Sequence, residues 1–346
     1  MKHGWLVLLT AMACAHGRGG SSAPSIEVQD ALHGARYSLP SGDGNWQVNR
    51  EGSARSTSGV EAEVSQFALA RPANAQQCRD NARLRLFPKR ESAAENANAS
   101  PDAPRDQSAG DAPTATWSFT TGAASAPVRN RWAFYSRGAD CLVLRVTGPK
   151  DDPFADQTFD TGMKTFQVLT LPPERQREVD FLAGTGFLER RDPASALERF
   201  EALTKREPDN AKAHFGALMA GFELGPEAYA RALPHGGVAL RSEHDLTPEQ
   251  RHLALRAMGV MQLAENQVKD AAETLAELVV RAPDLAEGQY NYACALARLG
   301  DAPGALDHLR AALRLDGDLA AHARQDEDLK SLRGSAAFEQ LTGSAK

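Results

Sequence analysis

Short runs of alternating apolar and polar residues mark the first half of this chain. Between residues 25 and 170 such runs recur, as they do along half-buried β-strands. VEAEVSQFALA, which contains Val60, Ala62 and Val64, alternates in this way, and so does ARLRLF from Ala82 to Phe87. Both runs therefore predict strands.

The end of this region predicts a hairpin followed by a helix. RWAFYSRGADCLVLRVTGP has the pattern of two strands that turn at residues 137–140. After it, Phe159, Met163 and Phe166 have helical spacing, and Asp152-Pro153 is a typical helix start. The order of strands, interruption, hairpin and closing helix predicts an α+β domain over residues 25–170, with an antiparallel sheet and helices packed against it.

In the C-terminal half, small and apolar positions repeat at a fixed interval. Ala271 and Ala305 are 34 residues apart, and three further pairs share that spacing. These are Leu275 and Leu309, Leu278 and Ala312, and Gly259 and Ala293. Small residues at this period indicate helix–turn–helix units that stack on one another.

The stretch AEGQYNYACALARLGDAPGALDHLRAALRLDGD, from Ala286 to Asp318, resembles a tetratricopeptide repeat. The positions that match the family pattern are Tyr290, Asn291, Ala293, Leu296, Leu299, Gly300, Asp301, Ala305, Ala312 and Leu315. The resemblance implies an all-α solenoid in which Ala293 and Ala305 are small because two helices touch there. Such solenoids seldom carry chemistry and offer a concave groove to another protein.

The repeats are expected to span residues 175–342, as about four units with a C-terminal cap over residues 323–341. Pro208 and Pro283 are 75 residues apart, which is two periods plus seven residues. The repeat between them is therefore expected to be diverged, with its extra length near residues 234–237, where Pro-His-Gly-Gly occurs.

The first residues have the parts of a secretory signal. Lys2 precedes an apolar run over residues 5–12, which is too short for a membrane span of about 20 residues, and Ala13 precedes Cys14. This ending resembles a bacterial lipoprotein signal, which implies that residues 1–13 are removed, that Cys14 is acylated, and that residues 14–24 form a flexible tether. Ala11 departs from the leucine of that family's pattern, and an ordinary secretory signal cut further on is the alternative. With Ala15 in place of an aspartate after the cysteine, the resemblance favours the outer membrane, facing the periplasm.

Residues 91–113 carry no aromatic or branched aliphatic side chain. Such a segment cannot bury enough apolar area to offset its ordering entropy, so it predicts a disordered loop inside the first domain. The rest of that domain has a further likeness. YSLPSGDGNW and the final hairpin and helix together resemble the Mog1/PsbP-like family, which implies a domain that holds partners rather than reacts.

The cysteines have separate expected roles. Cys14 belongs to the signal, and Cys294 is expected to be a packed thiol in the last repeat. Cys78 and Cys141 lie in one domain, and in an oxidising periplasm they are expected to form a disulfide. Two buried free thiols are the alternative, because the distance between them is unknown from the sequence.

Charge and motifs exclude several functions. The formal net charge is −6 and no basic cluster is present, so a nucleic-acid partner is not expected. The chain has no GxSxG, no HExxH and no phosphate-binding glycine loop, and we expect no enzymatic activity, no cofactor and no metal. His235, His244 and His252 are expected to be exposed to solvent. Residues 325–328 lack the spaced oxygens and glycine of a calcium loop and predict a charged turn.

The repeat resemblance also assigns a groove. Family positions that face inward fall here on Phe181, Phe215, Arg256, Tyr290, Asn291 and Arg298, and this aromatic and arginine lining suits an extended or helical peptide. Phe181 and Phe215 could equally be packing residues. The sequence thus favours a membrane-tethered scaffold or assembly factor of a cell-envelope complex that binds a protein partner. The alternative is a ligand-binding or enzymatic N-terminal domain for which the repeats are a docking arm.

Overall fold

The computed structural model describes residues 25–42, 45–49, 52–86, 100–101, 105–109, 112–241 and 243–343. The chain divides into two compact units, residues 1–176 and 177–346. Cys14, the expected signal and the whole of the expected tether lie outside the described residues.

The first unit contains two antiparallel sheets. One has three strands in the order β1-β2-β11, and the other has eight, in the order β3-β4-β5-β10-β9-β8-β6, with β7 also paired to β8. The strands are β1 (Ser25–Asp30), β2 (Ala35–Pro40), β3 (Gln47–Val48), β4 (Ala54–Arg55), β5 (Glu61–Ala68), β6 (Ser100–Pro101), β7 (Arg105–Ala109), β8 (Ala112–Thr121), β9 (Val128–Arg137), β10 (Asp140–Pro149) and β11 (Gln167–Val168).

The predicted hairpin is confirmed. β9 and β10 pair antiparallel with Arg137 opposite Asp140, and Gly138 in the turn has a φ of +62°, which suits a residue without a Cβ. Successive residues of β10 point to opposite faces, so Leu142 and Leu144 join one apolar cluster while Cys141 and Val143 join another. The sheet is therefore buried on both faces here.

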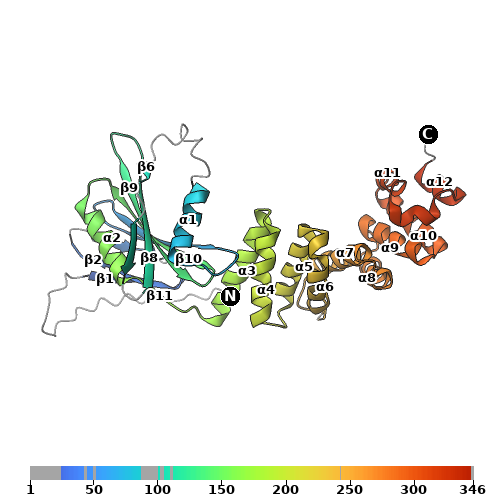
Figure 1. The fold of residues 1–346 in the computed structure, drawn as a ribbon, viewed down its shortest axis with the longest axis horizontal. Helices are drawn as coiled ribbons and strands as arrows, with labels where there is room; N and C mark the ends of the chain where they lie inside the picture. The colour runs from blue at the N-terminus through green and yellow to red at the C-terminus, as the bar shows by residue number, and fades with distance from the viewer. Residues whose placement is uncertain are drawn as a thin grey trace. The chain divides into compact units, whose positions relative to one another are not determined.

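One helix covers each of these two faces (Figure 1). α2 (Pro153–Thr165) begins where the sequence predicts, with the side chain of Asp152 accepting a hydrogen bond from the backbone N–H of Phe154. It buries Ala155 and Met163 against the cluster that contains Tyr37 and Tyr135. α1 (Ala75–Leu86) lies on the other face, against Trp117 and Trp132.

The strand predicted for ARLRLF is wrong, because its described residues, 82–86, form the last turns of α1. Ala82 continues the buried stripe that Ala75 and Cys78 begin, with the spacing of a helix. Leu84 and Leu86 are exposed, although strict alternation would have buried them on the same side as Ala82. Three alternating positions are too few to distinguish a strand from the end of a helix.

A disulfide joins Cys78 of α1 to Cys141 of β10. Their Cα atoms are 5.6 Å apart and 63 residues apart in the sequence. The bond therefore fixes α1 to the middle of the larger sheet.

The loop expected over residues 91–113 needs correction for its described part. β6, β7 and the start of β8 fall within it, and β6 and β7 both pair with β8. The hydrogen bonds of a strand are made by the backbone, so a polar segment beside an existing strand can pair without apolar side chains. The other residues of that range lie outside the described chain.

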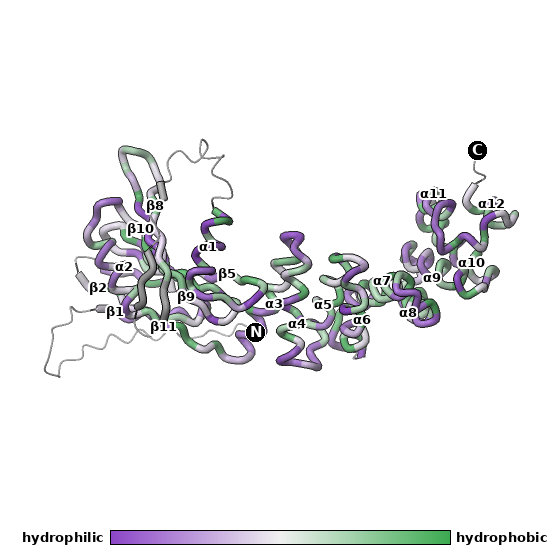
Figure 2. Tube along the Cα trace, viewed as in Figure 1, coloured by the Kyte–Doolittle hydropathy of each residue, from purple (hydrophilic) through white to green (hydrophobic). Residues whose placement is uncertain are grey.

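The second unit is a series of helix pairs followed by a cap, as the sequence predicts. The pairs are α3 (Pro173–Glu189) with α4 (Pro193–Arg206), α5 (Ala211–Leu224) with α6 (Pro226–Ala239), α7 (Pro248–Ala264) with α8 (Val268–Arg281), and α9 (Ala286–Leu299) with α10 (Ala302–Leu315). The cap consists of α11 (Leu319–Ala323), the 3₁₀ helix η2 (Glu327–Leu332) and α12 (Ala336–Thr342). Hydrophobic and hydrophilic residues intermix along these helices, as in amphipathic helices (Figure 2).

Small residues lie where the helices cross. A Cβ added to Gly184 or Gly216 would lie within 2.6 Å of the ring of Phe200, and one added to Gly259 within 2.5 Å of Leu275. Ala293 and Ala305 are fully buried in the last repeat. Small residues recur every 34 residues because the helices of each repeat approach one another closely at these positions.

The extra length of the diverged repeat is not where the sequence placed it. Pro234 and Gly236 lie inside α6, which has the same 14 residues as α4 and α8. Gly236 packs against Met258 there, and a Cβ at this position would require the Met258 side chain to move. The added residues are in the connection over residues 240–247 and in α7, which has 17 residues. Within the described residues, no helix is long and apolar enough to cross a membrane.

Candidate functional site

The last two repeats and the cap enclose a hollow of about 760 Å³. We call it the cap hollow. It is lined by Val260, Leu263, Ala264, Asn266, Val268, Tyr290, Asn291, Cys294, Ala297, Arg298, His322, Asp326, Glu327, Asp328, Lys330 and Ser331. α7 supplies an apolar wall, α9 a mixed one, and η2 with the turn before it an acidic one. Among the six predicted groove residues, Tyr290, Asn291 and Arg298 line this hollow.

Tyr290 is held by the cap and is not open to solvent. It is 5% exposed, and its hydroxyl donates a 2.7 Å hydrogen bond to Oδ2 of Asp326. Burial and this hydrogen bond raise the pKa of Tyr290 well above its ordinary value. The expectation that the side chain of Tyr290 is exposed is therefore wrong, because the residue belongs to the packing between α9 and η2. Its contact with a partner stays a prediction.

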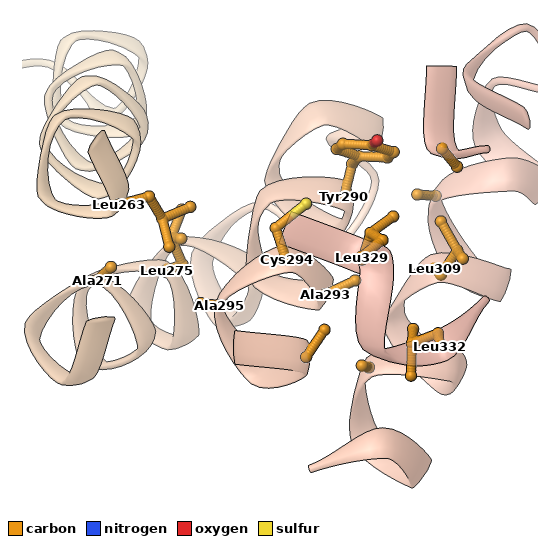
Figure 3. Packing of buried hydrophobic residues seen from close by; sticks show 14 of the residues in the cluster. Leu263, Ala271, Leu275, Tyr290, Ala293, Cys294, Ala295, Leu309, Leu329 and Leu332 are labelled. Carbon is orange, nitrogen blue, oxygen red and sulfur yellow. The ribbon is translucent and has the colours of Figure 1, made fainter. Parts of the chain in front are cut away.

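Cys294 follows Tyr290 by one helical turn and points to the same carboxylate. Its thiol sulfur lies 3.6 Å from Oδ2 of Asp326. Burial, followed by the negative charges of Asp326 and Asp328, raises the pKa of Cys294. The thiol therefore stays protonated at neutral pH and is not an activated nucleophile. Figure 3 shows it within the cluster that includes Leu329 and Leu332 of η2.

Arg298 joins three parts of the second unit. It donates to the backbone oxygen of Leu263 at 2.7 Å and to Oδ1 of Asn266 at 2.6 Å, and it forms an ion pair with Asp328 at 3.2 Å. Burial raises the pKa of Asp328, and the charge of Arg298 opposes that rise. Arg298 thus ties the end of α7 to the cap, and its contact with a partner stays a prediction.

Cys294, Asp326 and Asp328 could each offer one ligand atom, and these atoms lie within 4.8 Å of one another. The set does not suit a particular metal. Asp328 is already paired with Arg298, three protein ligands are one short of a structural zinc site, and a sulfur ligand does not suit calcium, which binds oxygen. Asp326 also accepts the bond from Tyr290. These groups hold the cap in place.

The other three predicted groove residues lie elsewhere in the repeats. Phe181 packs edge-to-face on Phe200, with ring centroids 5.7 Å apart. Phe215 is partly buried against the cluster around Leu218. Arg256 forms a 2.6 Å ion pair with Glu287 of the next repeat and lies over a phenylalanine of α5, Phe222, at 5.8 Å.

Sequence reasoning missed the cap's contribution to this site. Residues 325–328 were expected to form only a charged turn, yet Asp326 and Asp328 make the bonds that shape the hollow. The sequence feature that could have indicated this contribution is the pair Leu329 and Leu332, two apolar residues three positions apart directly after the turn. Both are almost fully buried. They place η2 on the inner side of α9.

Comparison with known proteins agrees with the repeat pattern. Residues 181–241 and 257–320 match the tetratricopeptide-repeat family model. The second unit therefore carries tetratricopeptide repeats, and the prediction from the 34-residue spacing is confirmed. No curated protein matches the chain.

Several solved structures are similar to this chain over about half of its length. A double mutant of MamA RS-1 has 19% identity over 48% of this chain and 94% of that chain, with a TM-score of 0.38. MamA from Desulfovibrio magneticus RS-1, residue 41 to its end, has 20% identity over 48% and 93%, with a TM-score of 0.37. YrrB, described as a TPR protein with an unusual peptide-binding site, has 18% identity over 47% and 84%, with a TM-score of 0.37.

Proposed function

We propose that this chain is a non-enzymatic interaction protein whose repeats hold a polypeptide segment of a partner. The observation that carries the proposal is the cap hollow, because it combines an apolar wall with polar groups in one concavity. Val260 and Ala264 can bury an apolar side chain of the segment, while Asn291 can hydrogen-bond to its backbone.

Partly exposed apolar side chains also occur on α5 and on the earlier part of α7. Phe215, Met219 and Phe222 are only partly buried, and Leu253 on α7 is 41% exposed. Aromatic residues and methionine are enriched at protein interfaces. A partner segment that lies along these side chains and ends in the cap hollow would bury its apolar residues against α5 and α7. Its end would contact the polar groups of the cap hollow.

The experiment compares two valines changed to glutamate in the full-length protein. Val260→Glu places a charge on the wall of the cap hollow, whereas Val280→Glu places the same charge on α8, where the valine is 80% exposed. Partners are captured from cell envelopes and counted by mass spectrometry. We expect Val260→Glu to capture at least tenfold less of a partner that the wild type captures specifically. Val280→Glu should capture as much of that partner as the wild type does. Equal capture by both variants contradicts the proposal.

We further propose that the chain works in a bacterial envelope, anchored through an acylated Cys14, facing the periplasm and in the outer membrane. Support comes from the order of Lys2, the apolar run and Ala13-Cys14 in the sequence. The Cys78–Cys141 disulfide supports an oxidising compartment. In that setting the repeats would act as a scaffold or assembly factor for an envelope complex.

For the first unit we propose a relationship to the Mog1/PsbP-like family and a role in holding a partner. Support comes from the order of its elements, in which the β9–β10 hairpin is followed directly by α2. Trp46, from the motif that suggested the family, donates a 2.8 Å hydrogen bond to the backbone oxygen of Pro40 and packs against Phe154 of α2.

A further inference from the structure

Two histidine side chains of the second repeat face each other. Nδ1 of His214 on α5 lies 2.9 Å from Nδ1 of His235 on α6, and the ring centroids are 4.9 Å apart. His214 is 8% exposed and the side chain of His235 is 14% exposed. The sequence-based expectation that His235 is exposed to solvent is therefore wrong. We call these two residues the histidine pair.

The neighbouring groups fix the tautomer of each ring. Nε2 of His214 lies 3.0 Å from the backbone oxygen of Pro208, which can only accept a hydrogen bond. His214 therefore carries its proton on Nε2 and presents the lone pair of Nδ1 to its partner. His235 must then donate from Nδ1, which leaves its Nε2 without a proton. That atom is 3.9 Å from Oε1 of Glu201 on α4.

This arrangement has room for one added proton. A proton on Nε2 of His235 points toward Glu201 and leaves the bond between the two rings intact. A second proton could go only to Nδ1 of His214, where it would face the N–H of His235. Two N–H groups and two positive charges would then meet at a distance that suits a hydrogen bond, so the contact would have to open.

The charged groups around the histidine pair do not offset a second charge. Glu201 is already engaged by two 2.5 Å hydrogen bonds from Arg231 of α6. On the His214 side, Asp209 is paired with Arg241 at 3.2 Å. Burial is the main cause that lowers the pKa of both histidines, and for His235 the charge of His214 adds to it.

We propose that the histidine pair makes the α5–α6 contact acid-sensitive: the contact is closed while the pair holds at most one proton, and it opens when both rings are protonated. The same two helices carry the ring contact between Phe222 and Tyr229, with centroids 6.3 Å apart. Opening would therefore disturb the inner surface of the second repeat. We therefore expect the repeats to bind a partner more weakly in acid. This expectation about binding rests on the proposed function.

The direction of the effect follows from proton linkage. In the opened state both histidines have an ordinary pKa of about 6.5, and in the closed state both pKa values are lower. The opened state therefore binds more protons as the pH falls. The closed contact has its full stability above about pH 6.5 and loses it as the pH falls through the two lowered pKa values. Each unit of difference in pKa is a tenfold change in the opening equilibrium.

Hydrogen exchange of the full chain tests this proposal without a partner. After correction for the intrinsic exchange rate, we expect α5 and α6 to open at least tenfold more at pH 5.0 than at pH 7.5. In His235→Gln the side-chain amide can donate to His214 or accept from it, so the response should fall below threefold. His308→Gln is the matched control, because His308 is also partly buried but bonds to Gln289 in the last repeat. A wild-type response below threefold, or an unchanged response in His235→Gln, overturns the proposal.

Nitrogen-15 NMR of the wild-type rings gives a second measurement that does not depend on how a variant folds. At pH 7.5 we expect the proton on Nε2 of His214 and on Nδ1 of His235, with two separate titrations on lowering the pH, both below pH 6.5. The opposite tautomers, or one shared midpoint near pH 6.5, overturn the proposal. Both measurements are made without a partner, so their failure leaves the proposed function standing. Failure of the Val260→Glu experiment likewise leaves the histidine pair standing.

Discussion

The hydroxyl of Tyr290 donates a 2.7 Å hydrogen bond to Oδ2 of Asp326, 36 residues further along the chain. Asp326 is also the first residue of the turn into η2, where its Oδ1 accepts from the backbone N–H of Asp328. One carboxylate therefore fixes both the start of η2 and its position against α9. Because Leu329 and Leu332 are almost fully buried beneath it, the cap is a fixed wall of the cap hollow.

Tyr290→Phe is expected to loosen this wall. The variant keeps the ring but leaves a mostly buried carboxylate with one donor fewer, and a hydrogen bond to a charged group contributes about 1.5–3 kcal/mol. Hydrogen exchange over residues 327–332 should rise by roughly tenfold or more, since 1.4 kcal/mol is a factor of ten. Tyr292→Phe on the same helix is the control, because the Tyr292 ring packs on His308. Equal exchange in both variants would show that the hydroxyl contributes little.

The sequence predicted the fold of the second unit well, for a physical reason. Close approach of helices requires small residues such as Gly259 and Ala293, and these recur visibly along the chain. The end of α1 was mistaken for a strand because Leu84 and Leu86 alternate with arginines in the sequence. Both leucines are exposed on the helix, so this alternation does not reflect a buried face. A short pattern cannot identify the element when its apolar residues face solvent.

The candidate site was only partly predictable. The family pattern put Tyr290, Asn291 and Arg298 on the inner face, and all three line the cap hollow. The family pattern describes only contacts between neighbouring repeats. It could not indicate that the cap returns to that face, where Asp326 bonds to Tyr290 and Asp328 pairs with Arg298. The contact between His214 and His235 was hidden for a similar reason, since each residue looks like an isolated polar position in its own helix.

The disulfide leads to a prediction about the first unit. Replacing both Cys78 and Cys141 by alanine removes a bond that closes a loop of 63 residues, for which chain entropy gives about 4 kcal/mol. The midpoint of unfolding of the first unit should fall accordingly, and peptide mapping without reductant should recover the two wild-type cysteines joined. Cys294→Ser changes a thiol in the other unit and should leave that midpoint unchanged. Recovery of both cysteines as alkylated thiols from periplasmic protein would contradict this prediction.

Lipid attachment at Cys14 leads to a prediction that can be tested in cells. Wild-type protein should incorporate labelled palmitate and fractionate with membranes, whereas Cys14→Ser should remain unlabelled. Cys294→Ser is the control, because its thiol is buried and should not affect labelling. A wild type that carries no label and is released into the soluble fraction would instead favour an ordinary secretory signal.

Two glycines of α3 should respond to alanine with opposite signs. Gly184 faces the ring of Phe200, and a Cβ there would approach it to 2.6 Å. Gly186, on the same helix, would meet only the end of the Arg190 side chain, at 3.3 Å, and that flexible group can move. Alanine in a helix is favoured over glycine by about 0.5–1 kcal/mol, whereas overpacking a core costs about 1–3 kcal/mol.

Gly186→Ala should therefore raise the urea midpoint of the repeats slightly, and Gly184→Ala should lower it despite the same gain in helix propensity. Circular dichroism at 222 nm on the full chain measures both midpoints under the same conditions. The double change Gly184→Ala with Phe200→Leu should recover part of the loss, because the smaller side chain makes room for the new methyl group. If Gly184→Ala instead stabilises as much as Gly186→Ala, the approach of α3 to α4 is looser than the structure indicates, and the small residues of the repeat are not there to let the helices meet.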